Sequence, residues 1–178
     1  MSEIIIRKAV VADVVAMQRL INAHAEQGEM LSRALHELYE DIRDFNIAVV
    51  DGEIIGCAAV HVNWANLAEV KSVVVDNAYQ GKGVGRKLVT AGISDARALG
   101  VAALYCLTEQ PEFFRSLGFH EIERDQLPRK VWSECIRCAK FNDCTEIAMR
   151  MEILDTPATA PADPLTSLAS LPVRSHGK

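Results

Sequence analysis

Three glycines stand at alternate positions in the sequence, Gly81, Gly83 and Gly85, shortly after an apolar run that ends at Val75. Glycine has no side chain, so a loop of this kind can present its amide N–H groups to a bound ligand. The residues that follow have helical spacing, and the positive N-terminal end of a helix also attracts anions. The sequence therefore predicts a cradle for phosphate, with a flexible turn as the plainer alternative.

The spacing of these glycines differs from the two best-known phosphate-binding loops. A dinucleotide-binding loop reads G-x-G-x-x-G, and a P-loop closes with Gly-Lys followed by Ser or Thr. The segment 81–86 reads GKGVGR and fits neither pattern. Lys82 and Arg86 either add positive charge to the cradle or are ordinary solvated side chains.

The composition limits the classes of protein to consider. The chain has 178 residues, 49% of them hydrophobic, and a formal net charge of -5. This length suits one domain with a substantial core, and the acidic balance argues against a nucleic-acid partner. No apolar run reaches the roughly 20 residues of a membrane helix, and the acidic N-terminus does not resemble a signal peptide. We therefore expect no membrane contact and a cytoplasmic location.

Apolar periodicity and turn residues predict an α/β protein of the α+β type, with a mixed sheet and helices on both of its faces. Asp51-Gly52, between two apolar runs, is the strongest hairpin signal. We expect Asp13 and Ser32 to cap the first two helices. The second helix should bury Leu35, Leu38, Tyr39, Ile42 and Phe45. The predicted strands cover 4–7, 46–50, 53–62, 69–76, 101–107, 119–123 and 145–153, and two further helices follow the glycine loop and Gln110.

The predicted domain covers residues 1–155 and includes a cysteine-containing insertion at 125–145. After Asp155 the sequence is rich in Ala, Pro, Ser and Thr and has no periodicity. Residues 156–178 are therefore predicted to be a disordered C-terminal tail.

Three cysteines fall in the insertion, Cys135, Cys138 and Cys144, with C-x-x-C spacing between the first two. A structural zinc site is one interpretation, although zinc prefers four ligands and only His120 offers itself as the fourth. A redox pair and ordinary packing are the alternatives, and no metal is the simpler expectation.

The segment 73–85 resembles the acetyl-CoA-binding motif of the GNAT superfamily of N-acetyltransferases. Gln80, Gly83 and Gly85 match its fixed positions after the apolar triplet, and FFRSLGF at 113–119 matches a second signature of the family. The resemblance covers residues 4–154. It implies the GNAT acyl-CoA N-acyltransferase fold, a central mixed β-sheet flanked by helices on both faces, with acetyl-CoA as co-substrate.

In that family the pantetheine arm of the coenzyme lies in a splay between two strands, and its pyrophosphate lies on the glycine loop. The resemblance assigns the pantetheine to the backbone of Val73, Val74 and Val75, with Phe114 either facing it or in the core. It assigns the pyrophosphate to the loop and the helix start, namely Gln80, Gly81, Lys82, Gly83, Val84, Gly85 and Arg86.

A second resemblance is to the acetyltransferase domain of N-acetylglutamate synthases, which serve arginine biosynthesis. It is carried by Gly-x-x-x-x-Arg at 28–33, IIGCAA at 54–59, Ala-Glu at 68–69 and LP-x-KVW-x-x-C-x-x-C-x-KF at 127–141. It implies L-glutamate as the acceptor, a small molecule whose two carboxylates need fixed cationic partners. Arg33 aligns with a glutamate-binding arginine of the family, and Lys130 is a second candidate. A surface role for Arg33 is the alternative, and Arg7 reads as an ordinary surface charge.

Attack on a thioester needs a neutral amine, so a base must remove a proton from the ammonium group. Glu69 occupies the position where some members of the superfamily place a carboxylate base. Strand alternation predicts that Glu69, Lys71, Val73 and Val75 share one face. A solvated glutamate at a strand end is the alternative.

Many superfamily members use a tyrosine as general acid for the leaving thiolate, and Phe114 stands at that position here. A phenyl ring cannot donate a proton, so the thiolate is expected to leave without an acid, as in the synthases. A backbone N–H near Val73 or Val74 is expected to stabilise the oxyanion.

Two other functions are consistent with these motifs. The chain is either an acetyltransferase of another amine, such as a different amino acid, a polyamine or a protein lysine, or a module that binds acetyl-CoA without catalysis. GNAT proteins often form homodimers, although no apolar stripe in this sequence marks an interface.

Overall fold

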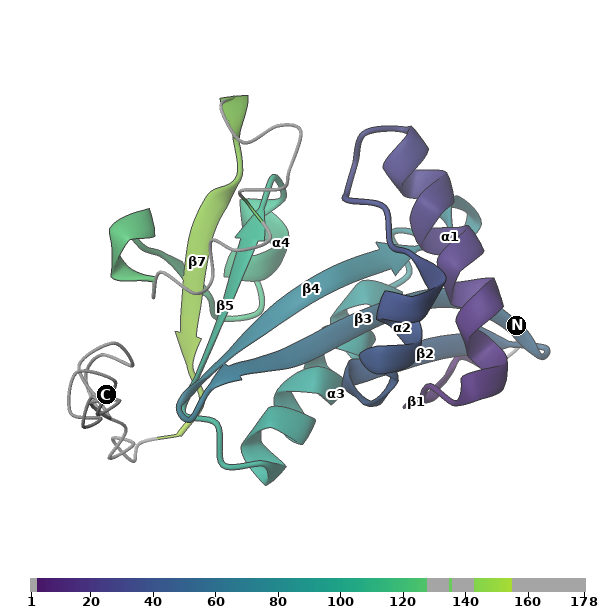
Figure 1. The fold of residues 1–178 in the computed structure, drawn as a ribbon, viewed down its shortest axis with the longest axis horizontal. Coiled ribbons are helices and arrows are strands. Elements are labelled where there is room, and N and C mark those ends of the chain that lie inside the picture. Colours follow the sequence, from purple (N-terminus) through teal and green to yellow (C-terminus); the bar gives the residue numbers. More distant parts are fainter. Residues whose placement is uncertain (1–2, 128–134, 136–142, 155–178) are drawn as a thin grey trace, which may run out of the picture.

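A computed structural model describes residues 3–127, 135 and 143–154 of the chain. In this part a seven-stranded mixed sheet has the order β1-β2-β3-β4-β5-β7-β6 (Figure 1). The strands are β1 (Ile5–Lys8), β2 (Phe45–Val50), β3 (Glu53–Trp64), β4 (Leu67–Val75), β5 (Ala103–Thr108), β6 (His120–Glu121) and β7 (Ile147–Glu152). The helices are α1 (Val14–Glu26), α2 (Leu35–Glu40), α3 (Val84–Ala98) and α4 (Pro111–Arg115), with short 3-10 turns η1 (Val11–Asp13), η2 (Ile42–Asp44), η3 (Asn77–Tyr79) and η4 (Arg124–Gln126).

Neighbouring strands from β1 to β4 are antiparallel, and Asp51-Gly52 forms the predicted hairpin between β2 and β3. Strand β5 is parallel to β4 after the α3 crossover and antiparallel to β7. The predicted mixed sheet is therefore confirmed. None of the described helices is long and apolar enough to cross a membrane.

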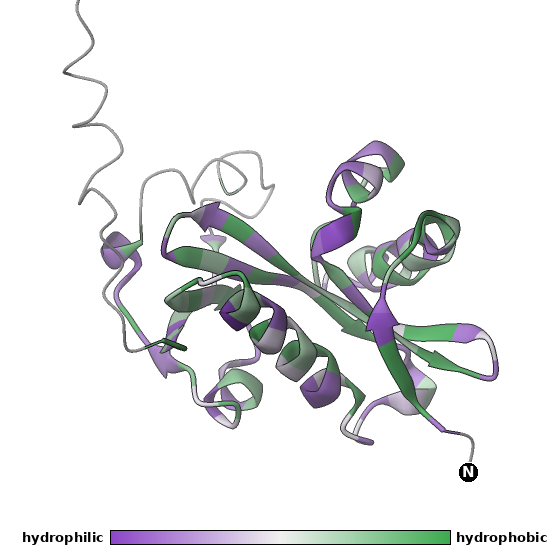
Figure 2. Ribbon diagram, turned by 90° about the horizontal axis from the view of Figure 1, so that it is seen from below, coloured by the Kyte–Doolittle hydropathy of each residue, from purple (hydrophilic) through white to green (hydrophobic). Residues whose placement is uncertain are grey.

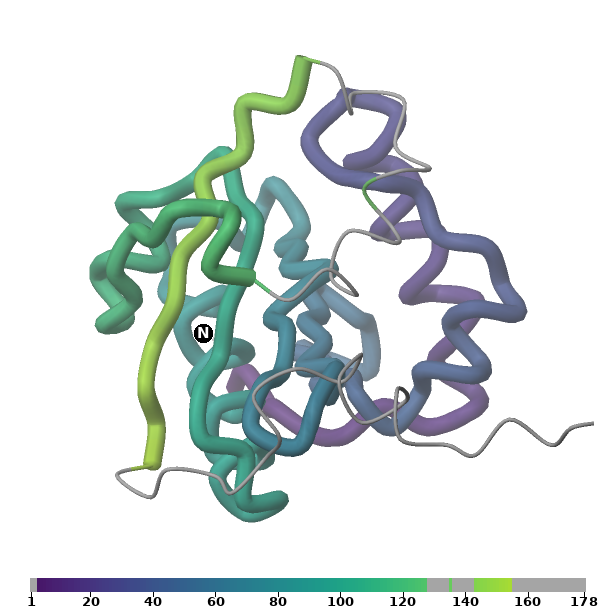
Figure 3. The backbone as a smooth tube through the Cα atoms, turned by 60° about the vertical axis from the view of Figure 1, so that its left-hand side comes forward, coloured from purple at the N-terminus to yellow at the C-terminus, as the bar shows by residue number. Residues whose placement is uncertain are grey.

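Helices cover both faces of the sheet. Val14, Met17 and Ile21 of α1 pack with Leu38 of α2 on one face. On the other face α3 packs against the sheet, and Phe114 of α4 joins the same core. Figure 2 shows α3 on one side of the sheet and α1 with α2 on the other, and Figure 3 shows the segments of α1–α2 and of β5–β7 on either side of the β3–β4 hairpin.

The ladder between β4 and β5 is short. It pairs Leu67 with Ala103, Ala68 with Leu104 and Glu69 with Tyr105, and then it ends. Beyond this point β5 continues alongside β7, while β4 continues alongside β3. The two strands therefore diverge as a V whose vertex is at Glu69 (Figure 1).

A β-bulge in β4 changes which side chains share a face. Ala59 pairs with Lys71 but Cys57 pairs with Val74, and Ser72 between them has a positive φ of 53°. Such a bulge adds one residue to its strand and re-aims the side chains that follow.

The consequence is visible in the core on the two sides of the bulge. Before it, Ala68 and Val70 pack toward α3; after it, Val73 and Val75 do so instead. Glu69 and Lys71 consequently face α1 and α2, opposite to Val73 and Val75. The prediction of one shared face was wrong because alternation does not continue through a bulge.

Helix α2 begins later than predicted. Its N-cap is Ala34, whose N–H donates to Oε2 of Glu37 at 3.0 Å, and Ser32 does not cap it. Leu38 is its buried residue, whereas Leu35 and Tyr39 are exposed. Arg33 therefore lies in the segment that enters the helix and not in its first turn.

Asp13 lies just before α1, but its carboxylate does not cap that helix. It accepts two hydrogen bonds from the Arg7 guanidinium, at 2.7 and 2.9 Å, and one from the Val10 N–H at 2.8 Å. Arg7 is therefore not an ordinary surface charge. The hydrogen bond from Arg7 holds the pKa of the Asp13 carboxyl below its usual value.

We expect Asp13→Asn to lower the free energy of unfolding by about 1–3 kcal/mol at pH 7, because charged hydrogen bonds to a largely buried group are lost. The Asp13 carboxyl has a lower pKa in the folded protein than in the unfolded chain, where it is about 3.9. Its ionised form therefore stabilises the fold fully above that pH, and the stabilisation is lost as the pH falls through the pKa of the folded state. Urea unfolding should show a difference from the unsubstituted protein that is larger at pH 7 than near pH 3. Glu26→Gln, at an exposed position on α1, is the control. An equal loss of unfolding free energy at both pH values in Asp13→Asn would contradict a stabilising role of the ionised Asp13 carboxylate.

Candidate active site

Side chains around η3 fix the shape of the glycine loop. Oδ1 of Asp76 accepts a hydrogen bond from the Ala78 N–H at 2.9 Å. The amide of Gln80 donates to the Val75 carbonyl at 3.1 Å and to Oδ1 of Asn77 at 2.9 Å. Gln80, predicted as a coenzyme-binding residue, thus ties the end of β4 to the loop that follows it.

Gly83 is the N-cap of α3 and has a φ of 78°, in the left-handed region that favours glycine. A Cβ added there would meet no atom within 4 Å, so open space surrounds this part of the loop. The Lys87 N–H donates to the Gly83 carbonyl, while the earlier amides of the first turn, from Val84 to Arg86, have no acceptor within the helix. These amides and this open space leave room for the predicted phosphate cradle, which stays a prediction.

Gly85 allows α3 to approach α4 closely. A Cβ at this position would lie 3.4 Å from the Phe113 ring and 3.7 Å from a methyl of Val75. Phe114 is 5% exposed and makes edge-to-face contacts with Phe113 and Phe119. Of the two predicted positions for Phe114, the structure favours the core.

Lys82 and Arg86 brace the loop with their side chains. Nζ of Lys82 donates to the Ala78 carbonyl at 2.9 Å and lies 5.0 Å from the centre of the Tyr79 ring. Arg86 donates to the carbonyl and to the hydroxyl of Ser116, at 3.2 and 2.8 Å. Both side chains thus have structural partners, in the loop for Lys82 and after α4 for Arg86, and their role toward phosphate stays a prediction.

The V between β4 and β5 opens beside this loop. Val73 and Val75 are half-buried on the α3 side, whereas Val74 is buried on the α1 side. Burial raises the pKa of the Cys106 thiol on β5, and the negative charge of Glu69 adds to this effect. Glu69 pairs with Tyr105 of β5 and is therefore the residue at the vertex of the V.

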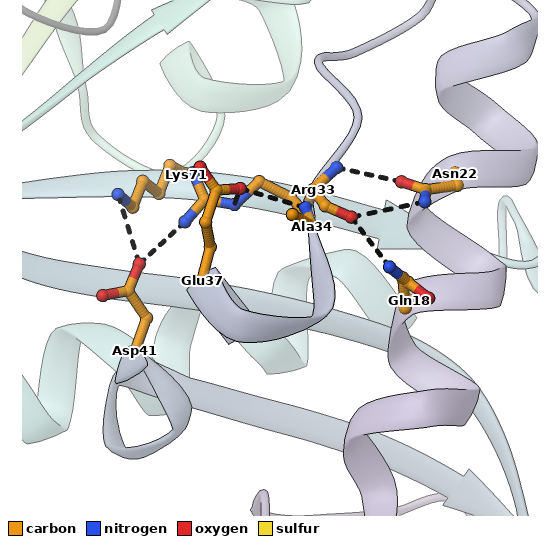
Figure 4. Close-up of polar contacts among 7 residues, drawn as sticks. All are labelled: Gln18, Asn22, Arg33, Ala34, Glu37, Asp41 and Lys71. Carbon is orange, nitrogen blue, oxygen red and sulfur yellow. Dashed lines mark hydrogen bonds and ion pairs between the residues drawn. The ribbon is translucent and has the colours of Figure 1, made fainter. Parts of the chain in front are cut away.

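Arg33 is held by α1 through its backbone (Figure 4). Its N–H donates to Oδ1 of Asn22 at 2.9 Å. Its carbonyl accepts hydrogen bonds from the side-chain amides of Gln18 and Asn22, at 3.1 and 3.3 Å. The segment that enters α2 is therefore fixed on the face of the sheet to which Glu69 belongs.

The Arg33 side chain meets Lys71 at a shared carboxylate (Figure 4). One guanidinium nitrogen donates to Oδ2 of Asp41 at 2.7 Å, and Nζ of Lys71 lies 3.8 Å from the same oxygen. The Arg33 and Lys71 side chains are each 10% exposed, and Glu37 lies 3.7 Å from Nε of Arg33. The structure thus joins Arg33 to Lys71, a residue that the sequence did not identify as part of the site.

Asp44 and His61 form a second pair on this face, with Nδ1 of His61 2.6 Å from Oδ2 of Asp44. The hydrogen bond from His61 to Asp44 raises the pKa of the imidazole. The ligand atoms of Asp41, Asp44 and His61 lie within 4.8 Å of one another. Arg33 and Lys71 already place positive charge at Asp41, so these residues do not favour a metal ion.

Two predicted site residues, Lys130 and Cys138, lie outside the described residues. Cys135 and Cys144 are half-buried, and a guanidinium nitrogen of Arg124 lies 3.4 Å from Sγ of Cys144. The choice between no metal, which was the simpler expectation, and a zinc site at these cysteines stays untested. Cys57 is a core residue, and burial raises the pKa of its thiol to about 12.

A mixed sheet that splays beside a glycine-rich helix start defines an acyltransferase of the GNAT type. The chain belongs to the Acetyltransferase (GNAT) family, whose family model matches residues 15–122. It is an acetyl-CoA-dependent N-acetyltransferase, as the resemblance of the loop predicted.

Individual relatives agree with this assignment. An uncharacterized N-acetyltransferase of Chlorobaculum tepidum is 38% identical over 144 residues, which cover 81% of this chain and 93% of the relative. An amino-acid acetyltransferase of Mycobacterium tuberculosis is 35% identical over 136 residues, which cover 75% and 78%. The structure of N-acetylglutamate synthase from Neisseria gonorrhoeae complexed with coenzyme A and N-acetyl-glutamate has a TM-score of 0.77 at 27% identity; the match covers 86% of this chain but 36% of that one.

We expect Gly83→Val to weaken the binding of coenzyme A by about ten-fold or more, because a branched side chain fills the cradle and strains a left-handed residue. Isothermal titration with coenzyme A measures this. Gly100→Val is the matched control, since Gly100 follows the other end of α3, has a φ of 80° and would also meet no atom within 4 Å. Equal weakening in both variants would assign the effect to backbone strain and contradict the cradle.

Proposed function

We propose that this enzyme transfers the acetyl group of acetyl-CoA to the α-amino group of L-glutamate, forming N-acetylglutamate for arginine biosynthesis. The observation that carries the proposal is the nearly buried Arg33 guanidinium, fixed between α1 and α2 on the face of the sheet that contains Glu69. Fixed guanidinium groups are suited to carboxylates. The relatives named amino-acid acetyltransferase and N-acetylglutamate synthase support a small amino acid as the acceptor.

In the proposed reaction the pantetheine arm lies along β4 and brings the thioester to the vertex of the V. Glu69 removes a proton from the acceptor's ammonium group, and the neutral amine attacks the thioester carbon. A backbone N–H near the bulge at Val73 or Val74 donates to the oxyanion. The coenzyme thiolate then leaves without a general acid, since the side chain at position 114 is phenylalanine.

The acceptor's carboxylates are proposed to lie near Arg33, with Lys71 as a second cation at 3.8 Å from the shared Asp41 oxygen. A guanidinium has five N–H groups and an ammonium has three, so either cation can contact more than one carboxylate. Lys130 stays a proposed contributor from the segment outside the described residues.

One observation favours a different acceptor. Four carboxylates, those of Glu37, Asp41, Asp44 and Glu69, lie on the acceptor side of the sheet, and such a surface also suits a cationic amine such as a polyamine. With such an acceptor the fold and the proposed mechanism would be the same, but the enzyme would not serve arginine biosynthesis. Binding of coenzyme A without turnover of any amine would indicate a module that does not catalyse transfer.

The experiment that tests the proposal measures thiol release from acetyl-CoA with a panel of acceptors: glutamate, glutamine, aspartate, lysine, spermidine and a lysine peptide. A blank without acceptor corrects for the protein's own cysteines. Turnover with glutamate that clearly exceeds turnover with the other amines supports the synthase activity. Preference for spermidine or the peptide would overturn the choice of acceptor.

We expect Arg33→Gln to raise the KM for glutamate about ten- to a hundred-fold, because a charge-assisted contact of about 1.5–3 kcal/mol is removed. The KM for acetyl-CoA should stay unchanged, and Arg33→Lys should recover part of the loss by restoring the charge. Arg43→Gln, at an exposed position of η2, is the matched control. Steady-state kinetics with each substrate varied in turn measures both constants, and an unaltered KM for glutamate in Arg33→Gln would rule out this role.

A further inference from the structure

The imidazole of His61 is fixed at one nitrogen by Asp44. Nδ1 lies 2.6 Å from Oδ2 of Asp44, and the two side chains are 36% and 25% exposed. This contact sets the tautomer, because an Nδ1–H that donates to a carboxylate leaves Nε2 as the acceptor in the neutral ring. Within the described ranges no hydrogen bond of Nε2 is present. His61 thus offers a basic nitrogen of fixed orientation.

The position of His61 relates it to the vertex of the V. In the β3–β4 ladder His61 is directly opposite Glu69, and Glu69 is the last residue of β4 to pair with β5. Opposite residues of an antiparallel pair point to the same face, with Cβ atoms about 4.5–5.5 Å apart. Because the two side chains project from the same face of adjacent strands, one water molecule can bridge the Glu69 carboxylate and Nε2 of His61.

Acetyl transfer requires a group that accepts the proton from Glu69, and Nε2 of His61 can accept it. A proton taken from the acceptor by half-buried Glu69 must leave before the next turnover. Imidazole, with an ordinary pKa of about 6.5, is a stronger base than a glutamate carboxylate at about 4.3, so the proton passes downhill from the carboxyl group to the ring.

The groups around His61 adjust its basicity. The hydrogen bond to Asp44 raises the imidazole pKa and is the largest effect, while burial and the positive charge of Lys71 oppose it. The negative charges of Asp44 and Asp41 raise the pKa further. Glu69 is the remaining charged residue that is paired with His61 in the sheet.

We propose that His61, oriented by Asp44, is a proton relay that carries the acceptor's proton from Glu69 to solvent. This inference rests on the proposed function only in requiring that an amine is acetylated. The nitrogen–hydrogen bond of the ammonium breaks as Glu69 takes the proton, and Nε2 then receives it through water and releases it to solvent. The amine lone pair forms the C–N bond, the C–S bond breaks with its electrons on sulfur, and the proton left on the amide-forming nitrogen passes to the thiolate or to water.

The kinetic test measures kcat as a function of pH, at saturating acetyl-CoA and acceptor, for His61→Gln, Asp44→Asn, Glu69→Gln and the double variant His61→Gln/Glu69→Gln. Because a positioned base contributes about 100-fold or more, we expect His61→Gln to lower kcat at neutral pH by at least about ten-fold, with the KM for acetyl-CoA unchanged. The acid limb of the profile, which reports loss of the neutral ring, should disappear in His61→Gln. It should move to lower pH in Asp44→Asn, since the contact that raises the imidazole pKa is lost.

A proton relay and a purely structural role of His61 predict different results for the variants. The double variant should be no slower than the slower single variant, because both residues serve one route, and added imidazole should restore part of the rate of His61→Ala. His36→Gln, at an exposed position of α2, is the control and should leave the profile unchanged. A profile of unaltered shape in His61→Gln, with only the thermal stability lowered, would overturn the relay and leave His61 as a structural link between η2 and β3.

A second measurement does not depend on turnover. Nitrogen-15 NMR of the imidazole reports which ring nitrogen carries the proton in the neutral state, and the relay requires Nδ1. A proton on Nε2 would overturn the relay even if glutamate is acetylated. Failure of glutamate in the acceptor panel contradicts the proposed function alone, because the same variants are then assayed with the amine that is acetylated.

Discussion

The parting of β4 from β5 after Glu69 is the constraint on which the site depends. A parallel ladder that stops after Tyr105 leaves the following part of β4 open to a ligand that can form hydrogen bonds along its backbone. The same divergence places the start of α3 beside the opening, since the chain turns through η3 directly from the end of β4. Strand edge and phosphate cradle are therefore consecutive in the sequence, and one extended molecule, coenzyme A, can contact both.

The bulge at Ser72 then places the charged and the apolar side chains of β4 on opposite faces of the sheet. Before the bulge β4 directs Glu69 and Lys71 toward α1 and α2, and after it Val73 and Val75 pack under α3. Without the extra residue the charged pair and the apolar pair would share a face. A small distortion of one strand thus separates the proposed acceptor residues from the packing that supports the glycine loop.

The parts of the site that sequence predicted are those built from neighbouring residues. The loop at Gly81, Gly83 and Gly85 is recognisable because backbone conformation and spacing are local properties. The contact of Arg33 with Lys71 through Asp41, and that of His61 with Asp44, join residues from different elements. Their pairing depends on the start of α2 and on the register of β3 with β4, and neither could be read from periodicity. The bulge also went unpredicted, because nothing in the run KSVVV marks a positive φ at Ser72.

The two halves of the site are held by different forces. The coenzyme side rests on glycine conformation, a strand bulge and apolar contacts, which respond little to pH or salt. The proposed acceptor side rests on the short helix α2. Leu38 is the buried residue of this helix, and the contacts of Glu37 and Asp41 with Arg33 support its position. Ion pairs weaken with salt and with protonation of their carboxylates. A movement of α2 would weaken the contacts of Arg33 and Lys71 with the Asp41 oxygen that they share. Conditions that loosen these ion pairs should therefore act on the proposed acceptor side before they act on the proposed coenzyme side.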